Sequence, residues 1–318
     1  MLLVTGGTGN SGRYFFEKLA KENYTGKIRC IVRHDSQTTI KLSEKRRAFS
    51  KNNLDFIKHS RLDVEFVYGN LLDKDFLMAS LVGVKTVLHI AGIHHSKNII
   101  SIGEKIGVDW FICVHTTGIF SKYPSINENY RSIEDKVIDN KNVTILRPTL
   151  IYGSGNDRKM SKLIHSISKG KFLPVVGFGK NLFQPVHAKD LANAYWSVLV
   201  SKKSLKGKQY NLAGKNKMTY KEMLYCISDN LDKRIILIFL PYTICLFFVH
   251  IYTFVHHVFK WREPYPEKSL IVTVEQVKRM TEDKAFSFDA ATNDFRYSPM
   301  SFKKGIRDQI NDLTEKTA

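Results

Sequence analysis

The chain has 318 residues, and its content of 43% hydrophobic and 25% charged residues is ordinary for a folded protein and argues against a disordered one. Its four cysteines form no CxxC pair, which argues against a zinc site and a disulfide framework and suits a reducing cytoplasm. The formal net charge of +19 comes without a nucleic-acid recognition motif, so we expect no nucleic-acid partner. Three interpretations of the charge stay open: a solvated lysine-rich surface, attraction to an anionic membrane face, or a field that draws in phosphate-bearing ligands.

The first half of the chain alternates short apolar runs with helical stretches, a pattern typical of βαβ units. The apolar runs are continuous rather than alternating, as in parallel strands that are covered on both faces. They predict strands at residues 2–5, 27–33, 64–68, 86–90, 110–114 and 143–146, with helices at 13–22, 73–81 and 128–138. We therefore predict an α/β fold with a Rossmann-type doubly wound parallel sheet, whose NAD(P)-binding domain spans residues 1–153.

The second half is less regular, and we assign residues 154–318 to a smaller, mostly helical substrate-binding region. Helical spacing predicts helices at 161–168, 191–200, 221–231 and 302–313, with strand and turn material between them at 172–179, 184–187 and 210–212. We expect the strand and helix segments near residues 184–200 to pack back on the first domain.

A glycine-rich segment, Thr-Gly-Gly-Thr-Gly-Asn-Ser-Gly, lies at residues 5–12 between the first strand and the first helix. Its spacing lets the backbone turn tightly, approach a pyrophosphate and pack the helix on the sheet. The N-terminus of the following helix offers free N–H groups and a partial positive charge to phosphates. The order of strand, loop and helix is the context that a dinucleotide site requires. The predicted cofactor-binding residues here are Gly6, Thr8, Gly9, Asn10 and Gly12.

The second strand ends in an arginine, Arg33. An acidic residue at this place would bind the ribose 2′-OH of NAD, whereas an arginine accommodates the 2′-phosphate of NADP. Arg33 therefore favours NADP as the cofactor. Asp35 follows closely and keeps NAD as the alternative.

Four further segments of the chain form recognisable motifs in addition to the glycine loop. They are Tyr-Gly-Asn-Leu-Leu-Asp (68–73), Val-Leu-His-Ile-Ala-Gly (87–92), Leu-Arg-Pro-Thr-Leu-Ile-Tyr-Gly (146–153) and Gln-Pro-Val-His-Ala-Lys-Asp (184–190). Together they resemble the extended and atypical branches of the short-chain dehydrogenase/reductase superfamily. Those branches include nucleotide-sugar epimerases, dehydratases and 4-keto-sugar reductases. The resemblance implies that Asn70, Leu71, Ala91, Gly92 and Pro148 also contact the cofactor. It further implies an NAD(P)-dependent oxidoreductase or epimerase that acts on a nucleotide-activated sugar, in the biosynthesis of a surface polysaccharide.

In this family a Ser or Thr after the fifth strand binds the substrate oxygen, and a Tyr-x-x-x-Lys pair on the next helix handles the proton. The resemblance places Thr116 or Thr117 at the hydroxyl position and Tyr130 at the tyrosine. The chain departs from the family pattern at the lysine, because the residue four positions after Tyr130 is Glu134. A nearby cation lowers a phenol's pKa and a nearby carboxylate raises it. Tyr130 is thus either a proton donor tuned by another cation or an ordinary helix tyrosine.

The cations that could replace the family lysine are Arg131, Lys122 and Lys136, and Tyr123 is the reserve candidate for the proton donor. On the substrate side we predict that Asn156, Arg158 and Gln184 contact the sugar or its diphosphate. We expect His187 to be structural. No metal-binding spacing of histidines and carboxylates occurs in the sequence, so we expect no metal.

Residues 235–259 contain no charged residue and are flanked by Lys233-Arg234 and Lys260-Trp-Arg262. Three interpretations compete: a buried or interfacial helix pair broken at Pro241, an interfacial anchor helped by the basic flanks, and a true membrane span. We expect peripheral membrane contact at most, in a cytoplasmic protein that works at the inner face of the membrane. By analogy with the family we also expect a homodimer.

Two alternatives to the nucleotide-sugar enzyme stay open. A non-catalytic NAD(P)H-binding sensor or membrane-associated scaffold is favoured by the missing lysine and the apolar stretch. A reductase for a lipid-like carbonyl draws on the apolar stretch alone.

Overall fold

The structure is a computed structural model that describes residues 1–33, 44–123, 129–154, 157, 159–201, 205–259 and 273–315. Side chains are described throughout these ranges except at 44–46, 253–259 and 315. Asp35, on which the NAD alternative depends, lies outside the described residues, as do Asn156 and Arg158.

The centre of the molecule is a seven-stranded sheet in the order β11-β6-β5-β4-β1-β2-β3. All neighbouring strands are parallel. The strands are β1 (Leu2–Thr5), β2 (Ile28–Val32), β3 (Val64–Tyr68), β4 (Thr86–His89), β5 (Trp110–Val114), β6 (Val143–Pro148) and β11 (Gln209–Leu212). The predicted Rossmann-type doubly wound sheet is confirmed. The strand order reverses direction between β1 and β4, which is where such sheets bind their ligands.

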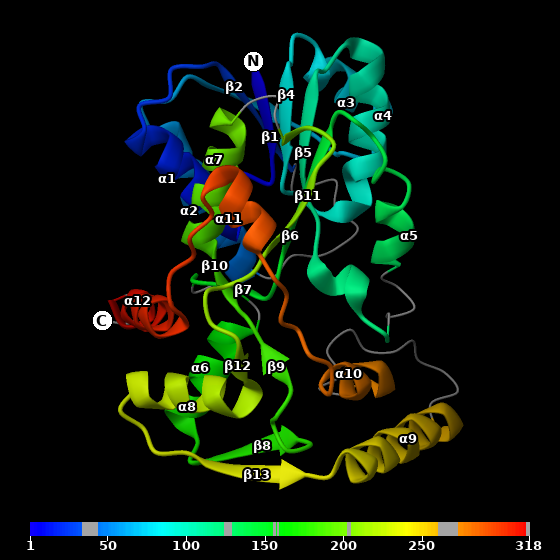
Figure 1. The fold of residues 1–318 in the computed structure, drawn as a ribbon, viewed down its shortest axis with the longest axis vertical. Helices are drawn as coiled ribbons and strands as arrows, with labels where there is room; N and C mark the ends of the chain where they lie inside the picture. Colours follow the sequence, from blue (N-terminus) through cyan, green and yellow to red (C-terminus); the bar gives the residue numbers. More distant parts are fainter. Residues whose placement is uncertain are drawn as a thin grey trace.

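Helices cover both faces of the sheet (Figure 1). One face carries α1 (Asn10–Lys21), α2 (Glu44–Lys58), α7 (Ala188–Val200) and α11 (Asp289–Phe295), and the other carries α3 (Lys74–Leu81), α4 (Ser96–Ile106) and α5 (Tyr130–Glu134). Adjacent strand residues such as Val87 and Leu88 join different cores, one on each face of the sheet. This explains why the central strands are apolar at nearly every position.

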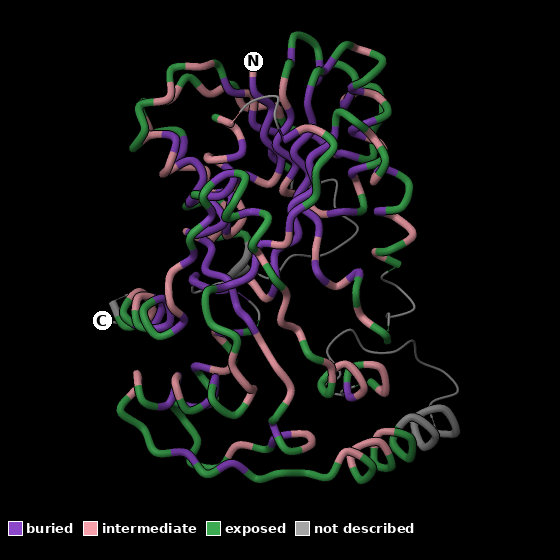
Figure 2. Tube along the Cα trace, viewed as in Figure 1, coloured by how far each residue is buried: buried purple, intermediate pink, exposed green. Residues whose placement is uncertain are grey.

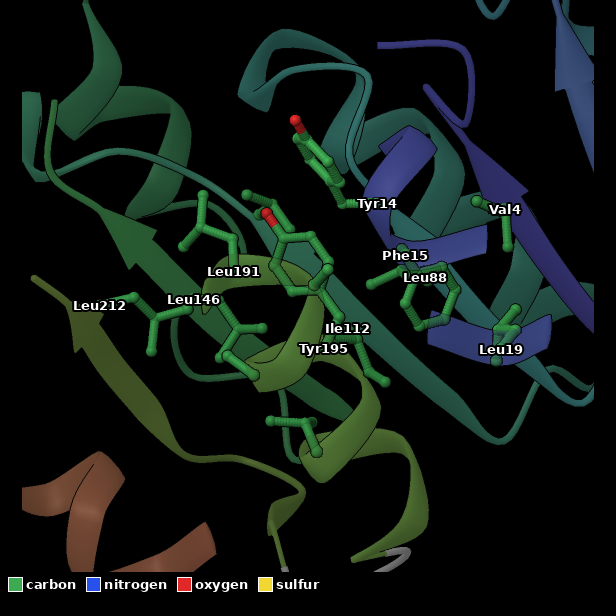
Figure 3. Packing of buried hydrophobic residues seen from close by; sticks show 14 of the residues in the cluster. Val4, Tyr14, Phe15, Leu19, Leu88, Ile112, Leu146, Leu191, Tyr195 and Leu212 are labelled. Atoms are coloured by element: carbon green, nitrogen blue, oxygen red, sulfur yellow. The ribbon is translucent and has the colours of Figure 1, made fainter. Parts of the chain in front are cut away.

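The largest core holds α1 against α7 (Figure 3). The rings of Phe15 and Tyr195 meet edge to face with centroids 6.1 Å apart, above Leu88 and Ile112 of the sheet. The Tyr195 hydroxyl donates a hydrogen bond of 3.3 Å to Ser11 beside the glycine loop. The segment near residues 184–200 therefore supports the helix that follows the loop.

Below the sheet lies a second, mostly helical lobe with its own core. It contains α6 (Met160–Lys169), α8 (Tyr220–Asn230) and α12 (Phe302–Glu315), packed on a parallel pair of strands, β8 (Phe172–Val176) and β13 (Ile236–Leu240). Thr219 and Glu222 form a capping box that fixes where α8 begins. Shorter strands β7 (Ile151–Tyr152), β9 (Leu182–Phe183), β10 (Val186–His187) and β12 (Met218–Thr219) connect the lobe to the sheet.

The apolar stretch forms two different elements, the strand β13 and the helix α9 (Tyr242–Phe259), which are separated by Pro241. Its first part pairs with β8 over five residues, from Ile236 opposite Phe172 to Leu240 opposite Val176. The stretch is therefore a strand and a helix rather than the helix pair that we considered. The residues before the proline form a strand because they pair with β8, which lies much earlier in the chain. In the described part of the chain, no helix is long and apolar enough to cross a bilayer.

Candidate functional site

The glycine loop is tightly closed against the start of α1. Gly6 has a φ of +74°, a backbone conformation that is strained for any residue with a side chain. The backbone of Ala91 also lies so close that a Cβ on Gly6 would be 2.8 Å from the Ala91 nitrogen. A Cβ on Gly12 would lie 2.3 Å from the Gly6 carbonyl oxygen. No side chain caps the N-terminus of α1 at Gly9, so nothing from the cap residue covers the first amides, which begin at Asn10. This cradle fits a dinucleotide pyrophosphate.

Replacing Gly12 by valine is expected to weaken NAD(P)H binding by at least about tenfold, because the new side chain would push the loop off the helix. A fluorescence titration with the reduced nicotinamide measures the affinity. Gly170→Val at the end of α6 is the matched control, since it lies in the second lobe and a Cβ there would be 3.3 Å from the nearest atom, the Ser166 carbonyl oxygen, rather than 2.3 Å as at Gly12. Equal cofactor affinity in the Gly12→Val and wild-type proteins would contradict the assigned cradle.

Two side chains of α2 brace the glycine loop. The Ser50 hydroxyl donates a hydrogen bond of 3.0 Å to Thr8 Oγ1, and the Asn53 amide donates one of 2.8 Å to the Thr8 carbonyl oxygen. Asn53 is only 1% exposed. Neither residue was predicted to act at the site, because no helix was predicted at residues 44–58.

A buried histidine holds the turn after β4 beside Gly6 through hydrogen bonds. His89 contacts the Thr5 hydroxyl at 2.7 Å through Nδ1 and the Gly92 carbonyl oxygen at 2.8 Å through Nε2. Burial lowers the pKa of His89 to about 3, so the ring is neutral at physiological pH. Nε2 then donates to the Gly92 carbonyl, and Nδ1 accepts from Thr5. These bonds place Ala91 and Gly92 at the edge where the cofactor is expected.

Three further predicted cofactor residues follow β2 and β3. Arg33 is exposed just after β2. It is close enough to His95 to add to the effect of burial in lowering the pKa of that ring. Asn70 uses its side-chain oxygen to accept a hydrogen bond of 3.0 Å from the Leu72 amide, and Leu71 is buried in the core under α3.

The structure brings the predicted catalytic residues to the same region after β5. Thr116 caps the short helix η3 (Thr117–Phe120) by accepting a hydrogen bond of 3.0 Å from the Gly118 amide. Thr117 is buried, and its hydroxyl donates a bond of 3.2 Å to the carbonyl oxygen of Pro148 at the end of β6. Tyr130 begins α5 next to Gly118, where a Cβ would lie 3.2 Å from the tyrosine ring.

A histidine that the sequence analysis did not assign to catalysis accompanies Tyr130. The ring of His94, in the short helix η2 (Ile93–His95), lies 5.7 Å from the Tyr130 ring between centroids. A cavity of about 360 Å³ opens beside Tyr130, and the cations Lys122 and Arg131 are among its lining residues. The Arg131 guanidinium donates to the Ile119 carbonyl oxygen at 3.3 Å.

Glu134, which stands where the family has its lysine, belongs to a buried polar network. Its carboxylate accepts hydrogen bonds from His115 Nδ1 at 2.7 Å and from Arg147 Nε at 2.8 Å. His115 also contacts Ser96 at 2.9 Å, and Arg147 donates to the Gln209 side chain at 2.6 Å. Burial alone would raise the pKa of the Glu134 carboxyl, but the bonds from His115 and Arg147 outweigh it and hold the pKa below its usual value. The negative charge of Glu134 is therefore matched inside the protein.

This network ties α5 to β5, β6 and β11 and was not predicted. Arg147 lies in the Leu-Arg-Pro segment that the sequence analysis singled out for the cofactor. Two features of the sequence could have indicated the network: an arginine, Arg147, inside an apolar strand, and a glutamate, Glu134, at the position of the family lysine. A buried charge requires a partner of opposite charge, and these two residues can supply it to each other.

On the substrate side, the structure describes only Gln184 among the predicted contacts, because Asn156 and Arg158 lie outside the described residues. Gln184 is 1% exposed, donates to the Gly214 carbonyl at 2.7 Å and accepts from the Phe286 amide at 2.9 Å. His187 is buried beside Gly153 and accepts from the Lys189 amide. Among the described residues, no three His, Cys, Asp or Glu side chains gather closely enough to hold a metal ion.

A family model described as the NAD dependent epimerase/dehydratase family matches residues 2–108 and 132–213, which is more than half of the chain. The chain belongs to this family. The family model confirms the expected resemblance and the predicted class of enzyme, an NAD-dependent epimerase or dehydratase.

Known proteins agree with this membership. The chain is 26% identical over 304 residues to NADH dehydrogenase [ubiquinone] 1 alpha subcomplex subunit 9 of Arabidopsis thaliana, covering 90% of this chain and 71% of that protein. Its structure resembles UDP-glucuronic acid 4-epimerase from Bacillus cereus, solved with UDP-glucuronic acid and NAD, with a TM-score of 0.72, 16% identity and 99% of both chains covered. It also resembles dTDP-glucose 4,6-dehydratase from Bacillus anthracis, solved with NAD, with a TM-score of 0.68, 17% identity and 99% and 96% covered. At these identities the structural likeness shows the fold.

Proposed function

We propose that this epimerase/dehydratase family member is an NAD(P)-dependent oxidoreductase or epimerase that acts on a nucleotide-activated sugar. The observation that carries the proposal is the placement of the cofactor cradle and the candidate catalytic side chains. The cradle follows β1 where the strand order reverses, and Thr117 and Tyr130 follow β5, on the other side of β4, at the same carboxyl edge of the sheet. The structural neighbour solved with both UDP-glucuronic acid and NAD supports this substrate class.

Each residue has a separate task in this proposal. When bound, a nicotinamide cofactor supplies the hydride acceptor or donor for a carbinol or keto carbon of the sugar. Thr117 binds the oxygen on that carbon, using the lone pairs that its bond to Pro148 leaves open. Tyr130 exchanges a proton with the same oxygen. Lys122 and Arg131, on the adjoining cavity, supply the positive charge that Glu134 does not.

The nucleotide part of the substrate requires further polar groups, which we assign to Asn156, Arg158 and Gln184. An arginine suits the diphosphate, because its planar guanidinium makes two parallel hydrogen bonds to phosphate oxygens. The side-chain amide of Gln184 already forms hydrogen bonds with Gly214 and Phe286. To contact the substrate, it would have to replace one of these hydrogen bonds with a hydrogen bond to the substrate.

The proposal is tested by incubating the purified protein with a panel of UDP-, dTDP- and GDP-linked sugars and with each nicotinamide in turn. Turnover, epimerisation or exchange of a sugar hydrogen with solvent is expected for at least one of them. The absence of all three reactions across the panel would contradict the proposal.

We propose NADP as the preferred cofactor, because Arg33 is exposed after β2 and offers its charge to a 2′-phosphate. Arg33→Asp is expected to reverse the preference, weakening NADPH relative to NADH by about tenfold or more. Parallel fluorescence titrations with the two reduced cofactors measure the ratio. Arg61→Asp, at another exposed arginine, is the control and should leave the ratio unchanged. An unchanged ratio in Arg33→Asp would leave NAD as the cofactor.

The biological setting belongs to the same proposal. We assign the protein to surface-polysaccharide biosynthesis, in the cytoplasm at the inner face of the membrane, and expect a homodimer as in other members of the family. Analytical ultracentrifugation tests the dimer, since a monomer at all concentrations would exclude it.

A second function, a non-catalytic NAD(P)H-binding scaffold, is favoured by one observation. The position of the family lysine is occupied by Glu134, which is fully engaged with His115 and Arg147. The similarity to a protein named as a subunit of NADH dehydrogenase points to the same alternative. Cofactor binding without any effect of Tyr130→Phe on the cellular phenotype would favour this function over the enzyme.

A further inference from the structure

Large apolar side chains are exposed along the end of the second lobe, on the paired strands β8 and β13 and on the helix α9. β13 and α9 follow one another along the lower edge of the molecule (Figure 1), and most of this stretch is exposed (Figure 2). The surface consists of the outer face of the β8–β13 pair and one side of α9, and we call it the apolar edge. It lies at the opposite end of the molecule from the N-terminus.

The strand part of the apolar edge has two apolar faces. Leu237 and Val175 are buried in the core of the second lobe. Their neighbours on the opposite face are also apolar but exposed: Phe172 by 61%, Ile236 by 46% and Ile238 by 45%. Ile236 stands directly opposite Phe172 in the register. A two-stranded sheet with one face in water normally alternates apolar and polar residues, so this outward face has the composition of an interface.

The helical part continues the same surface. Ile244, Phe247, Phe248 and Ile251 are 47%, 61%, 63% and 42% exposed. Their spacing of three, four and seven residues places them on one side of α9. The helix carries no Asp, Glu, Lys or Arg, and it rests on α10 (Val274–Arg279). The exposed side chains of this side are large and apolar, and a helix normally buries such a side against another element.

Positive charge borders the apolar edge. Lys233 and Arg234 precede β13, and Lys171 precedes β8. No acidic residue occurs in the sequence between Asp157 and Asp190 or from Lys233 to Phe259, the two stretches that supply these strands and α9.

The positive charge distinguishes between two partners that could cover the apolar edge, a second copy of the chain and a lipid bilayer. In a twofold dimer through this surface, the basic border of one copy would face the basic border of the other, which opposes association. An anionic bilayer complements both parts, since phenylalanine and isoleucine enter the headgroup and acyl boundary while lysine and arginine meet the phosphates. We propose that the apolar edge docks the protein on an anionic lipid bilayer, lying on the membrane without crossing it.

Flotation with lipid vesicles tests the docking surface on the full chain. The wild-type protein is expected to float with vesicles made of equal parts phosphatidylglycerol and phosphatidylcholine, and to float several-fold less with phosphatidylcholine alone. Phe247→Ser with Phe248→Ser is expected to lower the partition to anionic vesicles by at least about tenfold, because two exposed aromatic side chains no longer enter the lipid. Lys233→Glu with Arg234→Glu should remove the preference for anionic lipid.

Met78→Ser with Val82→Ser is the matched control, since these residues are 49% and 59% exposed at the end of α3, outside the apolar edge. It should float like the wild type, and cofactor binding and melting temperature report whether each variant is folded. Equal flotation of the wild type and the Phe247/Phe248 variant would overturn the proposal, as would equal flotation with neutral vesicles or none with either. A wild-type dimer that the Phe247/Phe248 substitutions dissociate, without vesicle binding, would assign the surface to a second copy instead.

Discussion

Replacing Tyr130 by phenylalanine is expected to lower the turnover of the nucleotide sugar by about 10²- to 10⁴-fold, the usual contribution of a positioned proton donor. The substitution removes only the hydroxyl and keeps the ring that packs beside Gly118 and His94. Affinity for NAD(P)H should therefore stay within about twofold, which is under 1 kcal/mol. Steady-state kinetics on the substrate found in the panel, with a cofactor titration alongside, measures both effects.

Tyr123→Phe is the informative comparison, because Tyr123 is the reserve candidate for the same proton transfer. Its side chain is 37% exposed and lies beside Lys278, whose ammonium is 5.8 Å from the ring centre. We expect Tyr123→Phe to retain nearly full turnover. A large loss in Tyr123→Phe together with none in Tyr130→Phe would move the proton donor to Tyr123.

Replacing Glu134 by alanine is expected to destabilise the protein by about 3–5 kcal/mol, because the change leaves the Arg147 guanidinium buried without its carboxylate. His115 loses its partner at the same time. Denaturant unfolding followed by circular dichroism measures the free energy of unfolding. A loss below about 1 kcal/mol would contradict the structural role that we assign to this network.

Glu65→Ala is the matched control for an ion pair at the surface. Glu65 pairs with Arg29 at 2.9 Å, but its side chain is 52% exposed. Such pairs contribute at most about 1 kcal/mol, since water and salt screen them. Comparing the loss of unfolding free energy in Glu134→Ala and in Glu65→Ala separates the effect of leaving a buried charge without a partner from the effect of losing an ion pair.

The stability due to Glu134 should also depend on pH. Because folding lowers the pKa of this carboxyl, the unfolded chain takes up its proton first as the pH falls. The contribution is therefore complete above the ordinary carboxyl pKa of 4.5 and is lost progressively at lower pH. The acid limb of the stability curve should be shallower in Glu134→Gln, where this group no longer titrates, and an identical limb would contradict the lowered pKa.

The sheet and the cofactor cradle could be predicted from sequence because local patterns encode them. Strands β1 to β6 are short, mostly apolar runs, and the glycine spacing has a steric cause that the structure shows at Gly6 and Gly12. The requirement for glycine at these positions comes from backbone atoms within a few residues or from the adjacent strand. Such constraints appear directly in the order of residues.

Features that depend on distant partners could not be predicted in the same way. β13 is a strand because β8, more than sixty residues earlier, pairs with it, and the apolar composition alone suits a helix equally well. The role of Glu134 depends on His115, which follows β5, and on Arg147 in β6. Sequence identified the missing lysine, but only the structure shows that the glutamate in its place is part of the protein's interior.

A single-turnover experiment tests the central claim most directly. The protein, loaded with NADP⁺ or NADPH and in excess over a nucleotide sugar, is mixed rapidly while nicotinamide fluorescence is followed. We predict a change in the redox state of the bound nicotinamide that depends on the sugar and is slowed about 10²-fold or more in Tyr130→Phe. A bound nicotinamide whose fluorescence reports no redox change with any nucleotide sugar, in the wild type and the variant alike, would contradict the account and leave a cofactor-binding scaffold.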